Sequence, residues 1–203
     1  MSIKDHPQQH KNTTVRQTTA TPTATGTPAG TPTTAGPVAA VLRIVMGLVF
    51  VWAFADKLFG WGYATPDKGA WLNGGSPTKG FLGSLDHGPF AAMFRDWAGA
   101  GLADWLFMLA LAGVGIAVIL GIGMRIAAVS GTLLMVMMWA AEWPLARFTD
   151  TGQPTMSTNP IIDYHIIYAL VLITLALIAA GNTWGLGKTW ANLDLVKKNP
   201  WLR

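Results

Sequence analysis

The sequence contains no cysteine among its 203 residues. A chain without thiols cannot build a disulfide relay, a cysteine nucleophile or an iron–sulfur cluster on its own ligands. Charge is also scarce, because 12% of the residues are charged, whereas soluble domains carry about 25%. The hydrophobic share is 51%. The composition therefore favours a protein surrounded by lipid, whose redox chemistry would need a bound quinone or a partner.

Four apolar stretches are each about as long as a bilayer is thick. A helix crosses about 30 Å of hydrocarbon with about 20 mostly apolar residues, since each residue rises about 1.5 Å. The stretches are Val38–Phe59, Trp105–Ile122, Ile126–Trp143 and Ile161–Ala180. They predict an all-α, integral membrane four-helix bundle, with one membrane domain over residues 38–190.

The two ends of the chain flank this domain. Residues 1–37 are rich in Thr, Pro, Ala and Gly, which predicts a disordered tail, and residues 191–203 form a short basic tail. Lys and Arg precede span one, follow span four and occur at Arg125 between spans two and three. The positive-inside rule then places both termini in the cytoplasm of a cell-membrane protein. The basic residues form no compact patch with interleaved aromatics, so we expect no nucleic-acid partner.

The segment between spans one and two is too long for a bare loop. Within Pro89–Ala98, four large apolar side chains recur at helical spacing: Phe90, Met93, Phe94 and Trp97. This pattern predicts a short amphipathic helix on the extracytoplasmic side, lying on the membrane or capping the bundle.

Small residues and polar caps predict how the spans pack and where span four begins. Span two carries Gly113, Ala117 and Gly121 at four-residue spacing, a stripe that lets a neighbouring backbone approach. Span three has a weaker version at Ala127 and Gly131. At span four, Asn159 is the expected N-cap and Pro160 the first helical residue, with Asp163 in the first turn.

Ionisable and tyrosine side chains gather where spans one and three end and where span four begins. Because successive spans alternate in direction, these three ends are expected at a similar depth. The residues are Asp56, Lys57, Glu142, Asp163, Tyr164, His165 and Tyr168. A histidine with acids and a tyrosine near lipid suits quinone chemistry, since one group hydrogen-bonds the quinone and another passes its proton to water.

These residues divide into candidate roles. His165, Asp163 and Glu142 are the candidate catalytic residues. The candidates for binding a quinone cofactor are Tyr164, Tyr168, Asp56, Lys57 and Arg43. The structural alternative is that the acids and Lys57 are interfacial residues, that Asp163 serves the helix dipole, and that Glu142 faces water.

Arg43 and Arg125 form a basic pair on the cytoplasmic side. Arg43 lies about 8 Å into span one by the rise per residue, from where its side chain can reach the headgroups. Headgroup binding, an ion pair within the bundle and simple positive-inside anchoring all remain open for the pair. No metal site is expected, because the four histidines form no ligand pair at helical spacing beside carboxylates.

Four pieces of the sequence resemble the DoxX/DoxD-like family of bacterial and archaeal membrane proteins. They are LRIVMGLVFVWAFADKLFG in span one, the loop WLNGGSPTKGFLGSL, the turn LGIGMRIAA, and NPIIDYHIIYALVLITLALIAAGNTWGLGKTW around span four. Together they cover about residues 38–190. The resemblance implies a multi-pass protein of a bacterial or archaeal inner membrane.

The resemblance implies one of two functions, one catalytic and one not. The DoxD-like branch includes the membrane subunit of thiosulfate:quinone oxidoreductase, which oxidises thiosulfate to tetrathionate and reduces quinone. A small subunit or a soluble redox partner would then be expected beside lipid and quinone. Other DoxX-like proteins are associated with oxidative-stress complexes, which implies instead a non-catalytic scaffold that anchors a partner. Transport by four spans would require a homo-oligomer to supply the missing half.

Overall fold

The computed structural model describes residues 35–148, 151–155 and 157–203. The expected disordered tail therefore lies outside the described residues, apart from residues 35–37, which begin the first helix. The longer helices are α1 (Ala35–Phe59), α4 (Gly101–Leu120), α5 (Met124–Glu142) and α6 (Tyr164–Leu177). The described part contains helices and one isolated β-bridge but no strand, which confirms the all-α prediction there.

Three of these helices are long and apolar enough to cross a membrane: α1, α4 and α5. Each begins within four residues of its predicted start. The fourth, α6, is apolar but has 14 residues, which corresponds to about 21 Å at 1.5 Å per residue. It ends early because Ala179 takes a left-handed backbone conformation with φ of 50°. That all four helices span the bilayer remains a prediction.

Shorter elements connect and follow these helices. Between α1 and α4 lie η1 (Asp67–Gly69), η2 (Trp71–Asn73), α2 (Lys79–Gly83) and α3 (Ala91–Trp97). After α6 come η3 (Ala180–Asn182), α7 (Gly187–Ala191), α8 (Asp194–Lys198) and η4 (Pro200–Leu202). The helix α3 thus forms where the spacing of Phe90, Met93, Phe94 and Trp97 predicted one, and Phe94 is buried. Its placement on a membrane stays a prediction.

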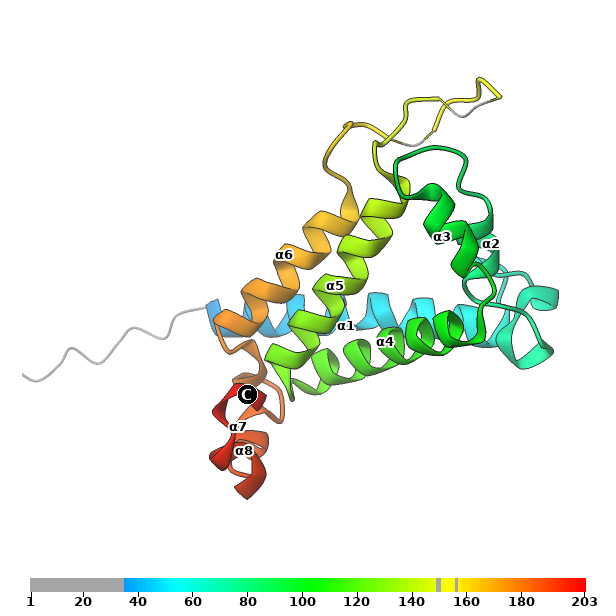
Figure 1. Ribbon diagram of the computed structural model, residues 1–203. Helices are drawn as coiled ribbons and strands as arrows, with labels where there is room; N and C mark the ends of the chain where they lie inside the picture. Colours follow the sequence, from blue (N-terminus) through cyan, green and yellow to red (C-terminus); the bar gives the residue numbers. More distant parts are fainter. Residues whose placement is uncertain (1–34, 149–150, 156) are drawn as a thin grey trace, which may run out of the picture. The chain divides into compact units, whose positions relative to one another are not determined.

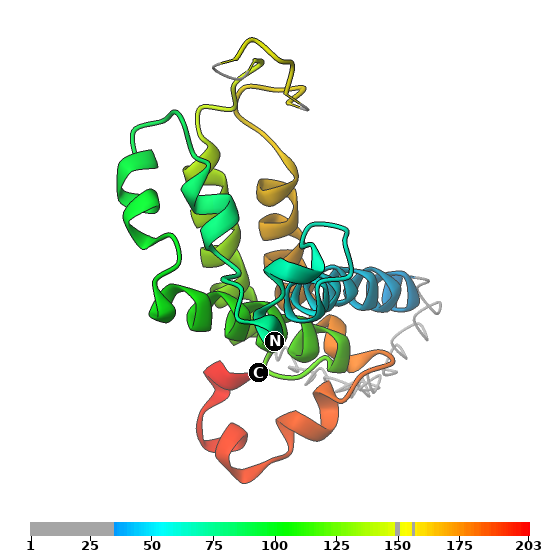
Figure 2. The ribbon, with the colours of Figure 1, turned by 90° about the vertical axis from the view of Figure 1, so that its right-hand side faces the viewer.

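The four long helices pack as two pairs. α1 runs along α4 and α5 runs along α6, while α4 and α5 join the pairs (Figure 1, Figure 2). The pairs lie closest where α4 turns into α5 and diverge toward α2 and α3 (Figure 1). Buried apolar side chains of all four helices form one core, including Phe50, Val114, Met135 and Leu172.

Glycines set the closest approach of the helices, at some of the expected positions and at one other. A Cβ at Gly121 would lie 2.7 Å from Gly181 Cα, so a neighbouring backbone approaches there as predicted. A Cβ at Gly115 would lie 2.9 Å from the backbone nitrogen of Val51, so α1 and α4 touch there. Gly113 faces open space, and the prediction that it packs against a neighbour is wrong. Gly121 ends α4 with φ of 72°. Gly131 packs as expected, since its Cβ would meet Leu172 and Val114 side chains.

Arg43 connects the C-terminal end of α4 to the chain after η3 by hydrogen bonds. We call this end of the molecule the Arg43 end. The Arg43 side chain is completely buried. One guanidinium nitrogen donates to the carbonyls of Val118, at 2.6 Å, and Ile119, and the other donates to Trp184 O at 2.9 Å. These are carbonyls of the last turn of α4 and of the chain after η3, so Arg43 is directed into the protein rather than toward headgroups. A buried cation at a helix C-terminus is favoured by the helix dipole.

Two buried carboxylates order the connection at the opposite end. Asp56, near the end of α1, accepts backbone hydrogen bonds from Tyr63 and Ala64 at 3.2 and 2.9 Å. Asp104, in the first turn of α4, accepts from the Ser76 hydroxyl and from both the backbone and the hydroxyl of Thr78. Buried carboxylates need such donors. Together they fix the chain between α1 and α4 over the diverging ends of the helix pairs.

Candidate functional site

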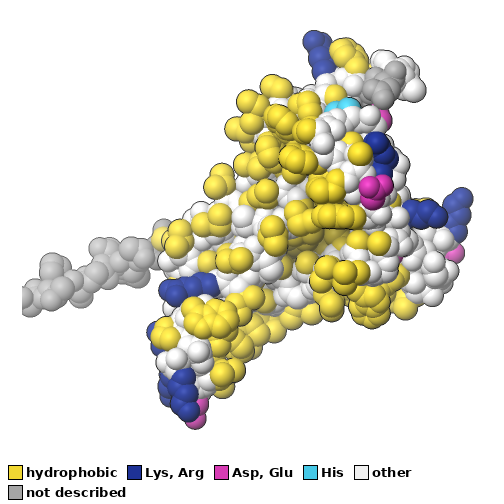
Figure 3. Space-filling view, viewed as in Figure 1, with side chains coloured by type: hydrophobic (Ala, Val, Ile, Leu, Met, Phe, Trp, Pro, Cys, Tyr) yellow, Lys and Arg dark blue, Asp and Glu magenta, His cyan; other side chains and the backbone are white. Residues whose placement is uncertain are grey.

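A cavity of about 1110 Å³ lies between the diverging helix pairs. We call this the cavity end of the molecule. Its walls come from α2, α3, α4, α5 and the chain between α1 and α2, with α1 and α6 contributing one residue each. The lining is mainly apolar and includes Phe94, Leu106, Phe107, Leu134 and Met138. Figure 3 shows hydrophobic side chains gathered over this side of α4 and α5.

The cavity is open to whatever surrounds the helices. Leu102, Leu106 and Leu133 line it and are 74%, 60% and 60% exposed. Because α4 and α5 are membrane-capable helices, that surrounding is lipid in a bilayer. An apolar molecule dissolved in the bilayer can therefore enter without crossing water.

A few polar side chains interrupt the apolar wall. Lys57, Lys79, Glu142 and Tyr164 all line the cavity. The Lys57 ammonium lies 5.8 Å from the centre of the Phe107 ring. Within the described part of the chain, no hydrogen bond or ion pair joins the side chains of Lys57, Glu142 or Tyr164 to another group. They are available to a ligand, as polar groups in ligand pockets usually are.

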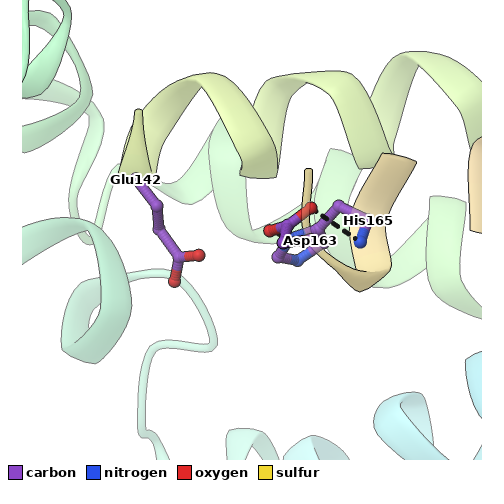
Figure 4. Close-up of side chains that lie close together, drawn as sticks. All are labelled: Glu142, Asp163 and His165. Carbon is purple, nitrogen blue, oxygen red and sulfur yellow. Dashed lines mark hydrogen bonds and ion pairs between the residues drawn. The ribbon is translucent and has the colours of Figure 1, made fainter. Parts of the chain in front are cut away.

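Glu142, Asp163 and His165 form a cluster beside this wall, which we call the acid–histidine cluster. One ligand atom from each lies within 4.8 Å of the others. Glu142 extends from the end of α5, while Asp163 and His165 come from the start of α6 (Figure 4). His165 is 1% exposed. The predicted meeting of the ends of spans three and four thus occurs in the structure.

Hydrogen bonds within the cluster orient the histidine. His165 Nδ1 lies 2.7 Å from a carboxylate oxygen of Asp163. Because an ionised carboxylate only accepts, Nδ1 carries the proton in this pair. The other ring nitrogen, Nε2, is buried and has no partner among the described residues. A neutral imidazole therefore presents one nitrogen that is free to accept a proton.

Asp163 also begins α6, a role expected of Asn159. Its carboxylate accepts from the backbone nitrogens of His165 and Ile166 at 3.0 and 3.3 Å, so Asp163 is the N-cap. The prediction that Asn159 caps this helix is wrong. The Asn159 amide oxygen instead accepts from Ile161 and Ile162 nitrogens at 2.8 and 3.0 Å, which forms a separate turn before the helix.

Two tyrosines connect the cluster with the cavity and the core. The Tyr164 ring lies 4.1 Å from the His165 ring and 5.6 Å from the Tyr168 ring. Tyr164 lines the cavity, whereas Tyr168 packs against the hydrophobic core. Tyr164 thus stands between the open cavity and the buried His165.

The structure separates the other predicted site residues. Lys57 joins the cavity wall, but Asp56 is occupied by the backbone donors of the following loop. Arg43 lies at the other end of α1, bound to carbonyls. Glu142, Asp163 and His165 therefore lie together, with the Tyr164 ring against His165, whereas Lys57 shares only the cavity wall with Glu142 and Tyr164.

His87 is a neighbour of the site that sequence reasoning did not assign. Its Nε2 lies 3.1 Å from the carbonyl oxygen of Pro144, just after α5. The hydrogen bond of its other nitrogen to the Asp86 carboxylate raises the pKa of His87. Gly88 abuts the same turn, because a Cβ there would lie 2.4 Å from Trp143 O. The only signal in the sequence was a histidine between an acid and a glycine in a loop.

The acid–histidine cluster has two chemical capacities. It can accept and release protons, since it combines two carboxylates with an imidazole. Its atoms are also ligand types that a divalent cation uses. Spacing in the sequence did not indicate a cation site, because Glu142 and His165 come from different helices.

Residues 38–143 match a family model described as DoxX. This range covers α1 from its fourth residue, α4 and α5, and it includes Lys57 and Glu142. No curated protein and no solved structure matches the chain.

Proposed function

The chain belongs to the DoxX family of membrane proteins, and from this premise we propose that it is a quinone-reducing membrane subunit that resembles thiosulfate:quinone oxidoreductase. The observation that carries the proposal is the position of the acid–histidine cluster at the wall of an apolar, lipid-accessible cavity. We place the protein in a bacterial or archaeal inner membrane with both termini in the cytoplasm.

The cavity suits a quinone in size and polarity. A quinone joins a flat ring with two carbonyl oxygens to an apolar tail. The apolar walls at α4 and α5 favour the tail, and the exposed leucines leave it a way in from lipid. The free ammonium of Lys57 and the hydroxyl of Tyr164 can each donate to a ring oxygen.

The cluster supplies protons for the reaction. Reduction of a quinone to quinol takes up two electrons and two protons, one at each ring oxygen. Glu142 and Tyr164 lie at the wall, where they can hand a proton to the ring. His165 lies directly behind them and can relay a replacement proton, because Asp163 holds the imidazole with Nε2 unprotonated. Nε2 first takes up a proton that comes from water and then passes it to Glu142 or Tyr164, which returns the imidazole to its neutral form.

Thiosulfate is the proposed electron donor. Two thiosulfate ions form one S–S bond to give tetrathionate and release two electrons, which balances the reduction of one quinone. The cations at the cavity end attract this dianion: Lys57, Lys79 and Arg95. A small subunit or soluble partner is expected to complete the thiosulfate site.

The test is thiosulfate-dependent reduction of a soluble quinone analogue by the purified protein, alone and with any protein that co-purifies. We expect His165→Gln and Asp163→Asn to lower the rate by about 100-fold, the usual worth of a positioned acid or base. Asp163→Asn keeps a good N-cap, so α6 should still form. Thr174→Val is the matched control, since its hydroxyl bonds to Leu170 O on the outer face of α6.

Three outcomes separate the possibilities. Activity of the isolated chain, lost in both cluster variants and kept in the control, supports the full proposal. Activity only with a co-purifying protein makes the chain a subunit of a complex. Wild-type protein that holds a stable partner but reduces no quinone in either form overturns the redox proposal in favour of a scaffold.

A further inference from the structure

The chain after η3 closes into a compact unit at the Arg43 end. The backbone nitrogen of Leu186 donates to Leu120 O at 2.8 Å, and that of Arg125 donates to Arg203 O at 3.1 Å. The Trp190 indole donates to Leu202 O at 2.7 Å, and Val196 is fully buried. We call residues 184–203 the C-terminal platform. The expected basic tail is part of this folded unit, attached to the end of α4 and the start of α5.

The platform exposes an unusual amount of apolar surface. Five large side chains stand out, between 47% and 65% exposed: Trp184, Leu186, Leu193, Leu195 and Trp201. The platform has short helices of five residues, too short to cross a membrane. Exposed leucine and tryptophan beside the ends of membrane helices are typical of the region where headgroups meet acyl chains.

Positive charge surrounds these apolar side chains. Lys188, Lys197, Lys198 and Arg203 lie on the platform, and Arg125 is attached to it. The single acid of the platform, Asp194, lies 3.9 Å from Lys197. Figure 3 shows Lys and Arg side chains gathered on the C-terminal segment next to hydrophobic ones. Lys188, Lys198 and Arg203 have no carboxylate partner within the described part of the chain.

We propose that the C-terminal platform binds anionic phospholipid headgroups. The ammonium and guanidinium groups would lie at the phosphates while the leucines and tryptophans reach the acyl-chain boundary. A free phosphate ion matches the charges but leaves the apolar side chains in water. A lipid matches both features, and the platform sits at the ends of membrane-capable helices, where lipid is the neighbour.

This proposal is independent of quinone chemistry, because the platform lies at the opposite end of the helices from the cavity. The acid–histidine cluster belongs to the end of α5 and the start of α6. The platform contacts the end of α4 and the start of α5. Loss of one activity therefore need not alter the other.

The experiment uses the full chain in nanodiscs that contain equal amounts of phosphatidylcholine and phosphatidylglycerol. After extraction into mild detergent, native mass spectrometry counts the lipids of each kind that remain bound. We expect the wild type to retain phosphatidylglycerol in preference. The variant Lys188→Gln/Lys197→Gln/Lys198→Gln should lose that preference by about tenfold or more, since each basic residue contributes to attraction of an anionic surface.

The matched control removes positive charge from the opposite end through Lys68→Gln/Arg147→Gln, two residues that do not line the cavity, and should retain the lipid. All three platform lysines are exposed, so their substitution should not unfold the chain. Hydrogen exchange of residues 184–203 should slow in phosphatidylglycerol nanodiscs relative to phosphatidylcholine alone, and inorganic phosphate should not reproduce this. Equal retention by the platform variant and the wild type, or equal protection by phosphate alone, would overturn the proposal.

Discussion

Replacing Gly115 with alanine should loosen the contact between α1 and α4, whereas the same change at Gly113 should not. A Cβ at Gly115 would lie 2.7 Å from Val51 Cγ2 and 2.9 Å from Val51 N. The side chain of Val51 can turn away, but its backbone nitrogen can move only with α1. At Gly113 a Cβ would meet nothing within 4 Å.

The magnitude follows from two opposing effects. Alanine is favoured over glycine within a helix by about 1 kcal/mol, and this gain is common to both variants because both sites lie inside α4. Overpacking a tight contact costs about 1–3 kcal/mol, and only Gly115→Ala incurs it. The free energies of unfolding of the two variants should therefore differ by about 1–3 kcal/mol, with Gly113→Ala the more stable.

The assay is reversible unfolding in mixed micelles with increasing denaturing detergent, followed by far-ultraviolet circular dichroism. Gly47→Ala tests the same contact from α1, since a Cβ there would lie 2.9 Å from Gly115 O, and it should resemble Gly115→Ala. Equal midpoints for Gly113→Ala and Gly115→Ala would refute the argument, because both would then lie against the same surroundings.

Three other predictions concern buried or hydrogen-bonded polar groups. Arg43→Met should lower the free energy of unfolding by about 1–3 kcal/mol, measured in the same assay, because it leaves the Ile119 carbonyl without its donor; an unchanged midpoint would contradict this. Asp104→Ala should speed hydrogen exchange of residues 76–79, because three hydrogen bonds to its carboxylate are lost; unchanged exchange there would show that other contacts hold the loop. The pKa of His87 is raised in the folded state, so its stabilisation is fully present below the unfolded pKa and is lost as pH rises through the folded one. The melting temperature of the wild type should exceed that of His87→Gln most at low pH and approach it at high pH; a difference that does not change with pH would contradict the assignment.

Hydropathy alone predicted the positions of the long helices. Apolar runs of membrane length admit few other structures, so α1, α4 and α5 could be placed within a few residues. The end of α6 could not, because a left-handed Ala179 follows from the packing of the chain after the helix rather than from its composition. The direction of the spans also predicted that Glu142 would meet the start of α6.

The sequence did not predict which face of each helix packs inward. Span two is apolar all round, and the four-residue spacing of its small residues favoured Gly113 for a helix contact, whereas Gly115 is the buried one of the two. The partners of Arg43 are carbonyls 75 to 141 residues away in the sequence, which no local pattern encodes. Asn159 and Asp163 both had the chemistry of an N-cap, and the turn at Ile161 decided between them.

The acid–histidine cluster was predicted in part. The residue types and the meeting of the end of α5 with the start of α6 could be inferred, whereas the position of the cluster beside lipid stays a prediction. The cavity itself could not be inferred, because it arises from the divergence of the two helix pairs. The hydrogen bonds that Asp56 accepts depend on the fold of the loop after α1. The sequence therefore did not predict that Asp56 lies apart from the cluster.

The central claim is that a quinone occupies the cavity with its ring at Glu142 and Tyr164. The most direct measurement is photo-crosslinking of the full chain in nanodiscs with a quinone analogue that carries a photoreactive group on its ring, followed by peptide mapping. We predict labelling near the end of α5 and the start of α6 that an excess of unlabelled quinone abolishes. Labelling confined to other helices, or labelling that unlabelled quinone does not reduce, would contradict the account.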